Sequence, residues 1–310
     1  MPGRSRKEPA VGQARPSTGG NYSHVGTAIS FHLPAWITLI LIIALPVGAA
    51  AYFSFSNMNL MQTGLQYRWV GLDNYRYILL DPRFWESVRI TAVFIFGAVS
   101  LELLGGIGIA LLLDAIRFGR RLYTSLIMVP MLLAPLVVGL TWNFLLNPQF
   151  GAATWAIHKL GLPLPPSILT DLRFALPAVI LSDVWEWTPF MALIVLAGLQ
   201  TIPLGLLDAA RVDGANVWQV IWTVKLPVIR PILIIGSFIR GIDAFRIFDI
   251  PYILTGGGPG SATEIIDLFT YRTAFKSWEM GKGTAVGIVL FILNVMLAFV
   301  LYRWMPKREA

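Results

Sequence analysis

The chain has 310 residues, of which 56% are apolar and only 13% are charged, and its formal net charge is +7. A soluble domain carries about a quarter charged residues, so this composition excludes a soluble globular protein and predicts an integral membrane protein. The absence of cysteine excludes disulfides, thiolate metal sites and cysteine nucleophiles. A positive balance is typical of membrane proteins with basic cytoplasmic loops, and we expect no nucleic-acid partner.

The N-terminal segment differs in composition from the rest of the chain. Residues 1–30 are rich in Gly, Pro and Ser and carry four basic side chains, which predicts a disordered basic tail on the cytoplasmic side. A cleaved signal peptide is the alternative, but the apolar run that follows is too long for such a signal. We expect a transmembrane domain over residues 31–305 and a short cytoplasmic C-terminal tail over residues 306–310.

Six stretches are long and apolar enough to cross a bilayer, which takes about 20 helical residues. They are Leu33–Phe55, Val88–Leu113, Leu122–Leu146, Phe174–Leu199, Val228–Leu254 and Thr284–Trp304. Backbone groups in hydrocarbon must be satisfied within their own segment, so each stretch is predicted to be a helix. The sequence therefore predicts an all-α integral membrane protein built as a six-helix polytopic bundle.

Lys and Arg residues are unevenly divided between the two sides of this bundle. Thirteen lie on the side that holds both termini and residues 203–227, and seven lie in the longer loops on the other side. Because cytoplasmic loops carry the excess of Lys and Arg, both termini and the 203–227 loop are predicted to be cytoplasmic. The outer loops, roughly residues 57–87, 147–172 and 255–283, are predicted to be ordered caps.

The fourth and fifth predicted helices carry charges at membrane depth, where each costs about 2.5–3.5 kcal/mol. The fourth holds Asp183 and Glu186, next to Trp187. The fifth holds a ladder of alternating charge at successive i+3 steps, namely Arg240, Asp243, Arg246 and Asp249. Neighbours in the ladder can pair. These residues either form a polar translocation site or only lock the two helices together.

The charge balance of these two helices bears on the solute. Four acids stand against two arginines, so a phosphorylated solute would meet net negative charge, and we expect a neutral sugar or polyol. An intramembrane enzyme with Asp183 and Glu186 as a carboxylate pair is one alternative. An ion-coupled secondary transporter that uses the buried Arg/Asp ladder is another. Glu102, in the second helix, either hydrogen-bonds between helices or lines the same path.

The segment from Pro203 to Pro227 is too charged to cross a membrane, although it connects two membrane helices. A first short amphipathic helix is expected to end at Gly214, and Asp213 can cap a second over Val217–Trp222. Pro227 then turns the chain into the membrane. Two short helices at a glycine elbow form a rigid unit that can dock in a groove of another protein. An interfacial helix that anchors the bundle is the alternative.

Three motifs resemble one family of transporters. Asp208-Ala-Ala-Arg-Val-Asp213-Gly214-Ala215, followed by Leu226-Pro227, resembles the EAA loop of binding-protein-dependent ABC importer permeases, although glutamate is usual where Asp208 stands. The segment from Tyr252 to Glu264, with Gly256-Gly-Gly-Pro259, and the segment Gly71-Leu-Asp-Asn-Tyr75 resemble sugar permeases of the maltose and glycerol-phosphate type. The six-span layout extends the resemblance over nearly the whole chain beyond residue 30.

The resemblance implies a type I ABC importer permease fold and a chain without catalytic residues. It implies that the loop contacts an ATPase subunit through Asp208, Ala209, Ala210, Asp213, Gly214 and Ala215. It also places solute contacts on the fourth and fifth helices. With the charged residues, the candidate translocation site is Asp183, Glu186, Trp187, Phe190, Arg240, Asp243, Ala244, Arg246 and Ile247.

The resemblance further implies a set of partners. They are two ATPase subunits, a second permease subunit expected to be a different chain, an external solute-binding protein and membrane lipid. ATP and Mg are expected on the ATPase subunits, and this chain is expected to bind no cofactor or metal, because Gly281-Lys282-Gly283-Thr284 lacks the spacing of a phosphate-binding loop. The expected location is a bacterial or archaeal cell membrane, the inner membrane in Gram-negative cells. Transport is expected to proceed by alternating access.

Overall fold

The computed structural model describes residues 24–62, 67–116 and 118–304. These residues form helices and loops, and among them the only extended pairing is an isolated bridge between Ser56 and Trp69. The predicted C-terminal tail, residues 306–310, and the predicted N-terminal tail up to residue 23 lie outside the described residues. The chain forms two compact units. The first ends at Ala49 and the second begins at Ala50.

The first unit is helical from His24 onward. Its elements are α1 (His24–Leu39), the π-helical turn η1 (Ile40–Ala44) and the first half of α2 (Leu45–Ser54). Pro34 lies inside α1.

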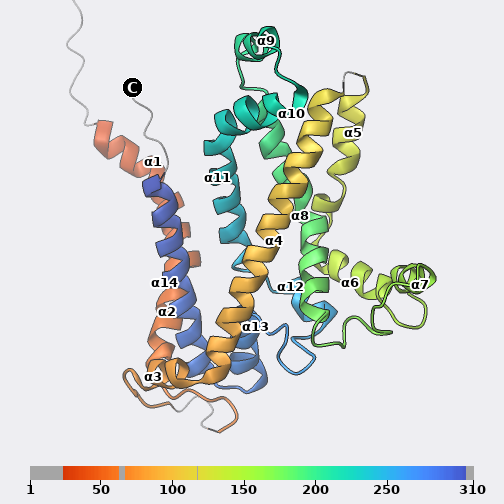
Figure 1. Cartoon of the computed structure of the whole chain (residues 1–310). Coiled ribbons are helices and arrows are strands. Elements are labelled where there is room, and N and C mark those ends of the chain that lie inside the picture. Colours follow the sequence, from red (N-terminus) through yellow and green to blue (C-terminus); the bar gives the residue numbers. More distant parts are fainter. Residues whose placement is uncertain (1–23, 63–66, 117, 305–310) are drawn as a thin grey trace, which may run out of the picture. The chain divides into compact units, whose positions relative to one another are not determined.

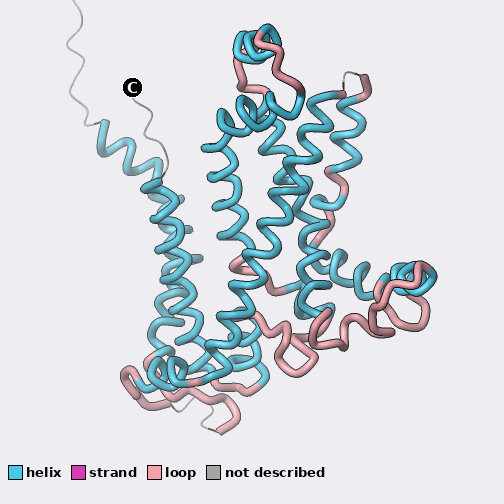
Figure 2. The backbone as a smooth tube through the Cα atoms, viewed as in Figure 1, coloured by secondary structure: helices cyan, strands magenta, loops and turns pink. Residues whose placement is uncertain are grey.

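The second unit holds the end of α2 and all later elements. In chain order these are α3 (Asp73–Leu80), α4 (Pro82–Ala115), α5 (Arg120–Ile127), η2 (Pro130–Leu132), α6 (Pro135–Leu145), α7 (Ala152–Lys159), α8 (Ala175–Leu199), α9 (Leu204–Val212), α10 (Val217–Val220), η3 (Ile221–Lys225), α11 (Leu226–Ala244), α12 (Asp249–Leu254), α13 (Ile266–Tyr271), η4 (Arg272–Lys276) and α14 (Met280–Trp304). In this unit α9 lies at one end of the long helices, and α3 and α13 lie towards the other (Figure 1). Loops of the second unit gather at both ends, which we call the α9 end and the α3 end (Figure 2).

Five helical segments among the described residues are long and apolar enough to cross a membrane. They are Phe31–Ser54, Pro82–Ala115, Ala175–Leu199, Val217–Ala244 and Met280–Val300. Each overlaps one of the six predicted spans, and the predicted all-helical membrane fold is confirmed. The second helix starts earlier than its apolar run, because the Asp81 side chain caps it by accepting a hydrogen bond from the Arg83 amide at 2.9 Å.

The third predicted span, Leu122–Leu146, is divided into two shorter helices. α5 and α6 are separated by the short 3-10 turn η2. Pro130 begins η2 and Pro135 begins α6. A proline has no amide hydrogen and its ring clashes with the carbonyl four residues earlier, so these two prolines end one helix and start the next.

The fifth predicted span, Val228–Leu254, is divided as well. α11 ends at Ala244 and α12 starts at Asp249. Pro251 explains the interruption, because in a continuous helix its ring would clash with the carbonyl of Ile247.

This division corrects the predicted charge ladder. Arg240 and Asp243 lie on α11, Arg246 lies in the connection, and Asp249 begins α12. Arg246 and Asp249 are also exposed rather than buried. The four charges therefore do not form one buried row along a single helix.

The predicted second short helix of the 203–227 loop is also wrong. Residues Val217–Ala244 form one apolar helical segment, in which α10 continues through the π-helical turn η3 into α11. The wider turn precedes Pro227 and lets the helix continue past it, so the proline does not redirect the chain. Asn216 caps this helix through a capping box, and Asp213 does not.

α4 packs along α8 in the second unit. Gly106 permits the close approach, because a Cβ atom there would lie 2.8 Å from Cγ of Met191 and 2.9 Å from the backbone nitrogen of Ala192. One buried cluster on this seam is centred on Phe94 and Val179. A second cluster joins α4, α8 and α11 and continues to α9.

Candidate functional site

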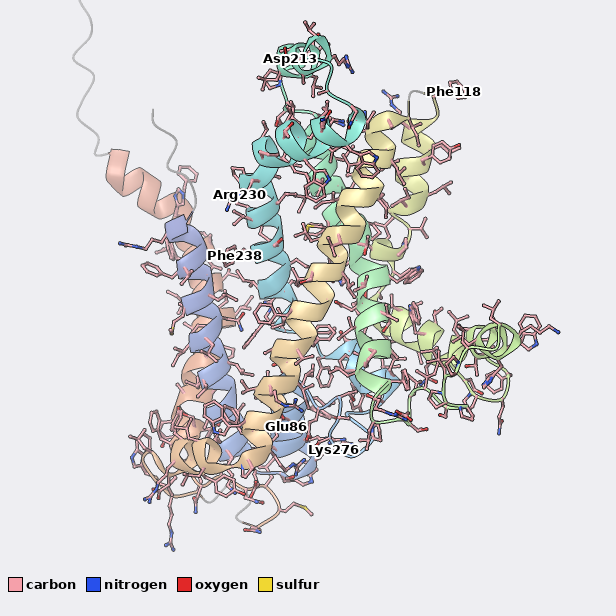
Figure 3. The ribbon with its side chains drawn as sticks, viewed as in Figure 1. Glu86, Phe118, Asp213, Arg230, Phe238 and Lys276 are labelled. Atoms are coloured by element: carbon pink, nitrogen blue, oxygen red, sulfur yellow. The ribbon has the colours of Figure 1, made fainter. Side chains whose placement is uncertain are left out.

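The loop between α8 and the α10–α11 helix projects at the α9 end, with Asp213 near its tip (Figure 3). α9 ends at Val212, and Gly214 follows with φ of +76°. A residue with a Cβ atom is strained in this left-handed conformation, which accounts for glycine at the elbow. Asp208 and Arg211 form an ion pair at 2.9 Å on the exposed side of α9.

The residues predicted to contact an ATPase gather on this loop. Asp208, Ala209, Asp213 and Gly214 are exposed, and Ala210 and Ala215 are half-buried. Leu204 and Val212 lie four residues before and after Asp208 on the same helical face, and they are 76% and 88% exposed. The prediction missed both, although their i±4 spacing from Asp208 could have identified them.

The loop is tied to the long helices beneath it. Leu207 of α9 packs against the buried cluster that includes Leu113 of α4 and Ile229 of α11. Lys225 of η3 binds Asp114 at the end of α4, with 2.7 Å between Nζ and Oδ2. Apolar packing therefore joins α9 to α4 and α11, and the ion pair joins α4 to the η3 turn that continues into α11.

A second group of predicted residues lines one charged cavity of about 380 Å³. The predicted residues among its lining are Asp183, Glu186, Trp187, Arg240, Asp243, Arg246 and Ile247. They come from α8, from α11 and from the connection that follows α11. Segments distant in sequence thus bring four carboxylates and two guanidiniums to one space, since Asp249 also lines it.

Arg240 is the centre of this group. Its side chain is 2% exposed and forms ion pairs with Glu102, Asp183 and Asp243. The Nε–Glu102 distance is 2.9 Å and the Nη1–Asp243 distance is 3.1 Å. The Nε–H is not aimed at the Glu102 oxygen, so this contact is an ion pair without a formed hydrogen bond. The Trp187 ring covers the guanidinium, with 4.8 Å between Cζ and the ring centroid.

Glu186 differs from the other buried acids of the cavity. It is 1% exposed, and its Oε2 atom has no hydrogen-bond partner among the described residues. A buried carboxylate oxygen without a hydrogen-bond donor is costly, so this atom carries an unmet hydrogen-bonding capacity at the wall of the cavity.

Two of the predicted solute contacts do not line the cavity. Ala244 is fully buried in the cluster around Phe94. Phe190 packs edge-on against Trp187, with 5.9 Å between ring centroids, and so supports the ring that covers Arg240. Arg246 lines the cavity, but its side chain is 67% exposed, and it lies 3.9 Å from Asp243.

Sequence analysis left Glu102 as either a hydrogen-bonder between helices or a lining residue, and it did not identify Arg240 as its partner. The carboxylate of Glu102, on α4, is fully buried and forms an ion pair with Arg240. The predicted site comprised residues of the fourth and fifth helices only and therefore did not include α4. Phe248, Asp249 and Ile250 also line the cavity. The only available signal was the cost of a lone buried acid, which requires a cation on another helix.

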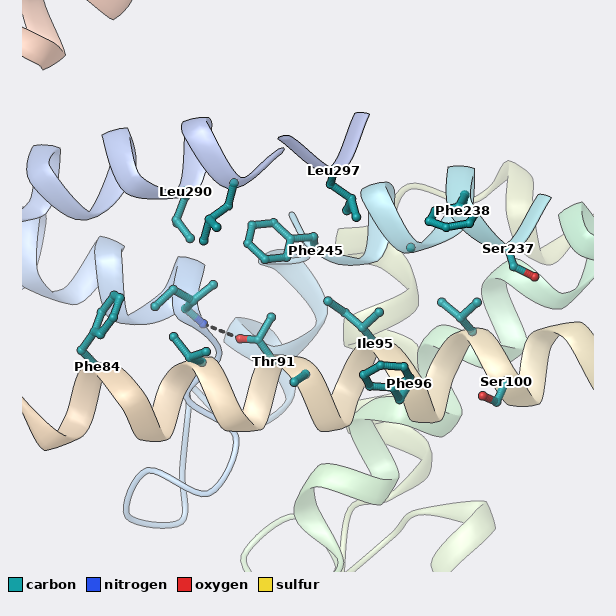
Figure 4. A pocket seen from close by; sticks show the side chains of 16 residues that line it. Phe84, Thr91, Ile95, Phe96, Ser100, Ser237, Phe238, Phe245, Leu290 and Leu297 are labelled. Atoms are coloured by element: carbon teal, nitrogen blue, oxygen red, sulfur yellow. Dashed lines mark hydrogen bonds between the residues drawn. The ribbon is translucent and has the colours of Figure 1, made fainter. Parts of the chain in front are cut away.

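An apolar cavity of about 520 Å³ lies between α4, α11, α13 and α14. Figure 4 shows its lining of Phe84, Ile95, Phe245 and Leu290, with few polar atoms. The Thr91 hydroxyl accepts a hydrogen bond from the Ile266 amide at 2.9 Å. This cavity contains none of the predicted site residues and no charged group, so it is not the predicted translocation site.

The described part of the chain contains no group of three or more His, Cys, Asp or Glu residues that could hold a metal ion. Residues 102–309 match the family described as binding-protein-dependent transport system inner membrane component. The chain belongs to this family. The match covers the 203–227 loop and all residues that line the charged cavity, and the predicted recognition as an ABC importer permease is confirmed.

Individual relatives agree with this assignment. The permease is 36% identical to the probable ABC transporter permease y4oQ of Sinorhizobium fredii, over 87% of this chain and 88% of that protein. It is 38% identical to the trehalose/maltose transport permease MalF of Thermococcus litoralis, over 74% and 78%. A chain in the crystal structure of a bacterial alginate ABC transporter, in complex with an alginate pentasaccharide-bound periplasmic protein, shares the fold. Its TM-score is 0.75 at 20% identity, with 89% and 92% of the two chains covered.

Family membership settles the class of the protein. The permease is a multi-pass, non-catalytic transmembrane subunit of an ABC importer, and ATP hydrolysis belongs to separate subunits. The ion-coupled alternative gains no support from these relatives. Its structural basis, a continuous buried ladder, is also lost because Arg246 and Asp249 are exposed.

Proposed function

We propose that this permease carries a neutral sugar or polyol through the charged cavity. The observation that carries the proposal is the charge of the lining, which comprises Asp183, Glu186, Asp243 and Asp249 against Arg240 and Arg246. An anionic solute would meet a net negative formal charge there, whereas hydroxyl groups can donate to carboxylates. The relative MalF of Thermococcus litoralis is described as a trehalose/maltose permease, which supports the same class.

Contacts with solute would come from groups that are not already used by the fold. Arg240 directs its guanidinium at three carboxylates and stacks under Trp187, so it mainly holds α4, α8 and α11 together. The unpartnered Glu186 oxygen and the part-exposed Asp243 can accept hydrogen bonds from solute. The remaining predicted residues, Phe190 and Ala244, would support the site without touching solute.

The proposed partners follow from the same assignment. The complex would hold two ATPase subunits with ATP and Mg. One of them would bind this chain at the α9 end through Asp208, Ala209, Ala210, Asp213, Gly214 and Ala215, joined by Leu204 and Val212. An external solute-binding protein would deliver sugar at the α3 end, and a second permease subunit of a different chain would complete the path. Closure of the ATPases would push α9 and turn the cavity outward, giving alternating access.

This arrangement requires the α9 end and both termini to face the cytoplasm of a bacterial or archaeal cell. The chain has no cysteine, so one introduced cysteine reports on one position. Val212→Cys should be protected from a membrane-impermeant maleimide in intact cells, because the reagent does not reach the cytoplasmic α9 end. Val212 is 88% exposed, so burial within the permease would not account for this protection. Lys159→Cys, on the exposed end of α7, should react. The reverse pattern would contradict the proposed orientation and coupling.

The solute class is tested by uptake into proteoliposomes that contain the complete importer, with radiolabelled trehalose and glycerol 3-phosphate as probes. We expect ATP-dependent uptake of trehalose, which unlabelled maltose inhibits, and no uptake of glycerol 3-phosphate. Uptake of glycerol 3-phosphate in preference to trehalose would contradict the charge argument. Glu186→Gln should reduce trehalose uptake without preventing assembly.

A further inference from the structure

Four aromatic side chains form a continuous column near the charged cavity. Phe248 and Tyr252 are stacked, with ring centroids 5.2 Å apart and 15° between the ring planes. Tyr271 of α13 meets both rings edge-on, at 5.2 Å from Phe248 and 5.5 Å from Tyr252. Phe275 extends the column, 5.6 Å from Tyr271. None of these residues belongs to the predicted translocation site.

The column adjoins the charged cavity through α12. Phe248 and Asp249 line the cavity, and Tyr252 follows them at i+4 and i+3 on the same helical face. Tyr252 is 40% exposed and follows the lining residues Phe248, Asp249 and Ile250 in sequence, although it is not part of the lining itself. Phe248 and Tyr271 pack on the buried cluster of Ile265 and Leu268, which fixes the column on the rigid part of the unit.

Polar groups accompany the rings. Asp267 precedes Tyr271 by one helical turn of α13, and the charge of Arg246 acts on it. The Tyr252 and Tyr271 side chains are in ring contact, with 5.5 Å between centroids, so both of these hydroxyl-bearing rings belong to the column. Aromatic faces, carboxylates and hydroxyls thus occur together at one edge of the cavity.

This combination matches the chemistry of a pyranose ring. The face of an aromatic ring carries partial negative charge and attracts the C–H groups on the flat side of a sugar. The hydroxyl groups around the sugar rim need acceptors and donors in the same plane, which carboxylates and tyrosine hydroxyls provide. An apolar solute could not hydrogen-bond to the carboxylates, and a small inorganic ion has no C–H surface to pack on the aromatic faces.

We propose that Phe248, Tyr252 and Tyr271 form a stacking platform where the pyranose ring of an incoming sugar rests before it enters the charged cavity. This inference rests on the proposed function, which places the α3 end outside. α12 and α13 lie in the half of the second unit that is farther from α9 (Figure 1). A sugar released at the α3 end would meet the platform first and Asp183 and Glu186 afterwards.

The experiment compares the amount of trehalose taken up with the amount of ATP hydrolysed, in proteoliposomes that contain the complete importer. Tyr252→Leu retains a large apolar side chain at this position but removes the aromatic ring. It should lower trehalose uptake per ATP about three- to tenfold, because sugar not held at the platform returns to the outside. Tyr252→Phe keeps the ring and should restore most of the ratio. Tyr77→Leu is the matched control, because Tyr77 is a half-exposed tyrosine of α3 outside the cavity lining.

Each outcome bears on the platform. An equal loss of uptake and ATP hydrolysis in Tyr252→Leu, or a wild-type ratio in both Tyr252→Leu and Phe248→Leu, would overturn it. In either case, trehalose uptake by the wild-type importer would still support the proposed function. If the wild-type importer takes up none of trehalose, maltose and glycerol, the proposed function and the platform are both wrong. If Tyr252→Leu does not assemble, Phe248→Leu with Tyr252→Phe gives the same comparison.

Discussion

Replacement of Arg240 tests the buried charge cluster most directly. Removing the guanidinium leaves Glu102 and Asp183 without a counter-charge, at 0% and 2% exposure of their side chains. Breaking a buried pair in this way costs about 3–5 kcal/mol. Since about 1.4 kcal/mol is tenfold, we expect Arg240→Met to raise the equilibrium constant for unfolding by roughly two to three and a half orders of magnitude.

The measurement is denaturant unfolding of the purified permease in detergent, followed by helical circular dichroism. Arg246→Met is the matched control, because Arg246 is 67% exposed and has one ion pair at 3.9 Å, worth less than about 1 kcal/mol. The triple variant Arg240→Met, Glu102→Gln, Asp183→Asn removes charge from both sides and should recover most of the loss. The reasoning is refuted if Arg240→Met is as stable as Arg246→Met, or if the triple variant is no more stable than Arg240→Met.

Three further predictions use other parts of the second unit. Gly106→Ala should destabilise the permease by about 1–3 kcal/mol, because the added methyl group overpacks against α8. Gly108→Ala is the control and should not destabilise it, since nothing lies within 4 Å of a Cβ atom there. Thermal denaturation of the two variants tests the difference. Gly214→Asp should reduce co-purification of the ATPase subunits while backbone strain at φ of +76° costs the permease only about 1–2 kcal/mol, and undiminished retention would contradict docking at the elbow. Burial raises the pKa of Asp267 to about 6, above the unfolded value of 3.8, so its favourable contribution is complete below pH 3.8 and is lost as the pH rises through about 6. Heat survival of the wild type should therefore fall between about pH 4 and 6, and Asp267→Asn should remove this part of the fall.

Features determined by local composition could be predicted from the sequence. Apolar runs of sufficient length gave the spans, because the hydrocarbon thickness fixes the number of helical residues needed to cross it. The elbow at Gly214 was predictable for a similar reason, since Asp-Gly after a short amphipathic run indicates a helix end with positive φ. Both signals depend only on residues close together in the chain.

Proline effects were harder to predict, because a proline in a membrane helix can either kink it or end it. Pro130 and Pro135 divide the third span, and Pro251 divides the fifth, whereas α11 continues through Pro231. The difference depends on whether neighbouring groups satisfy the freed carbonyls, and that is decided by tertiary packing. The predicted ladder was wrong because it assumed that the helix containing Arg240 continued to Asp249.

Long-range pairing was not predictable from one sequence. Asp183 and Arg240 were both identified as candidates, but periodicity does not show which face of a buried helix meets which neighbour. Glu102 illustrates the gap, since it lies far from Arg240 in sequence and has no local partner. The cost of a lone acid predicts that a cation exists, and only the fold identifies it.

The same packing explains how the loop and the cavity can work together. Leu207 of α9 packs on the cluster that contains Leu113 of α4 and Ile229 of α11. Glu102 lies eleven residues before Leu113 on α4, and Arg240 lies eleven residues after Ile229 on α11. Each of these helical segments spans about 16 Å and connects the cluster beneath α9 to one partner of the Glu102–Arg240 ion pair. A push that tilts α4 relative to α11 therefore acts where Glu102 meets Arg240, which makes the buried pair the element through which motion of α9 would reach the cavity.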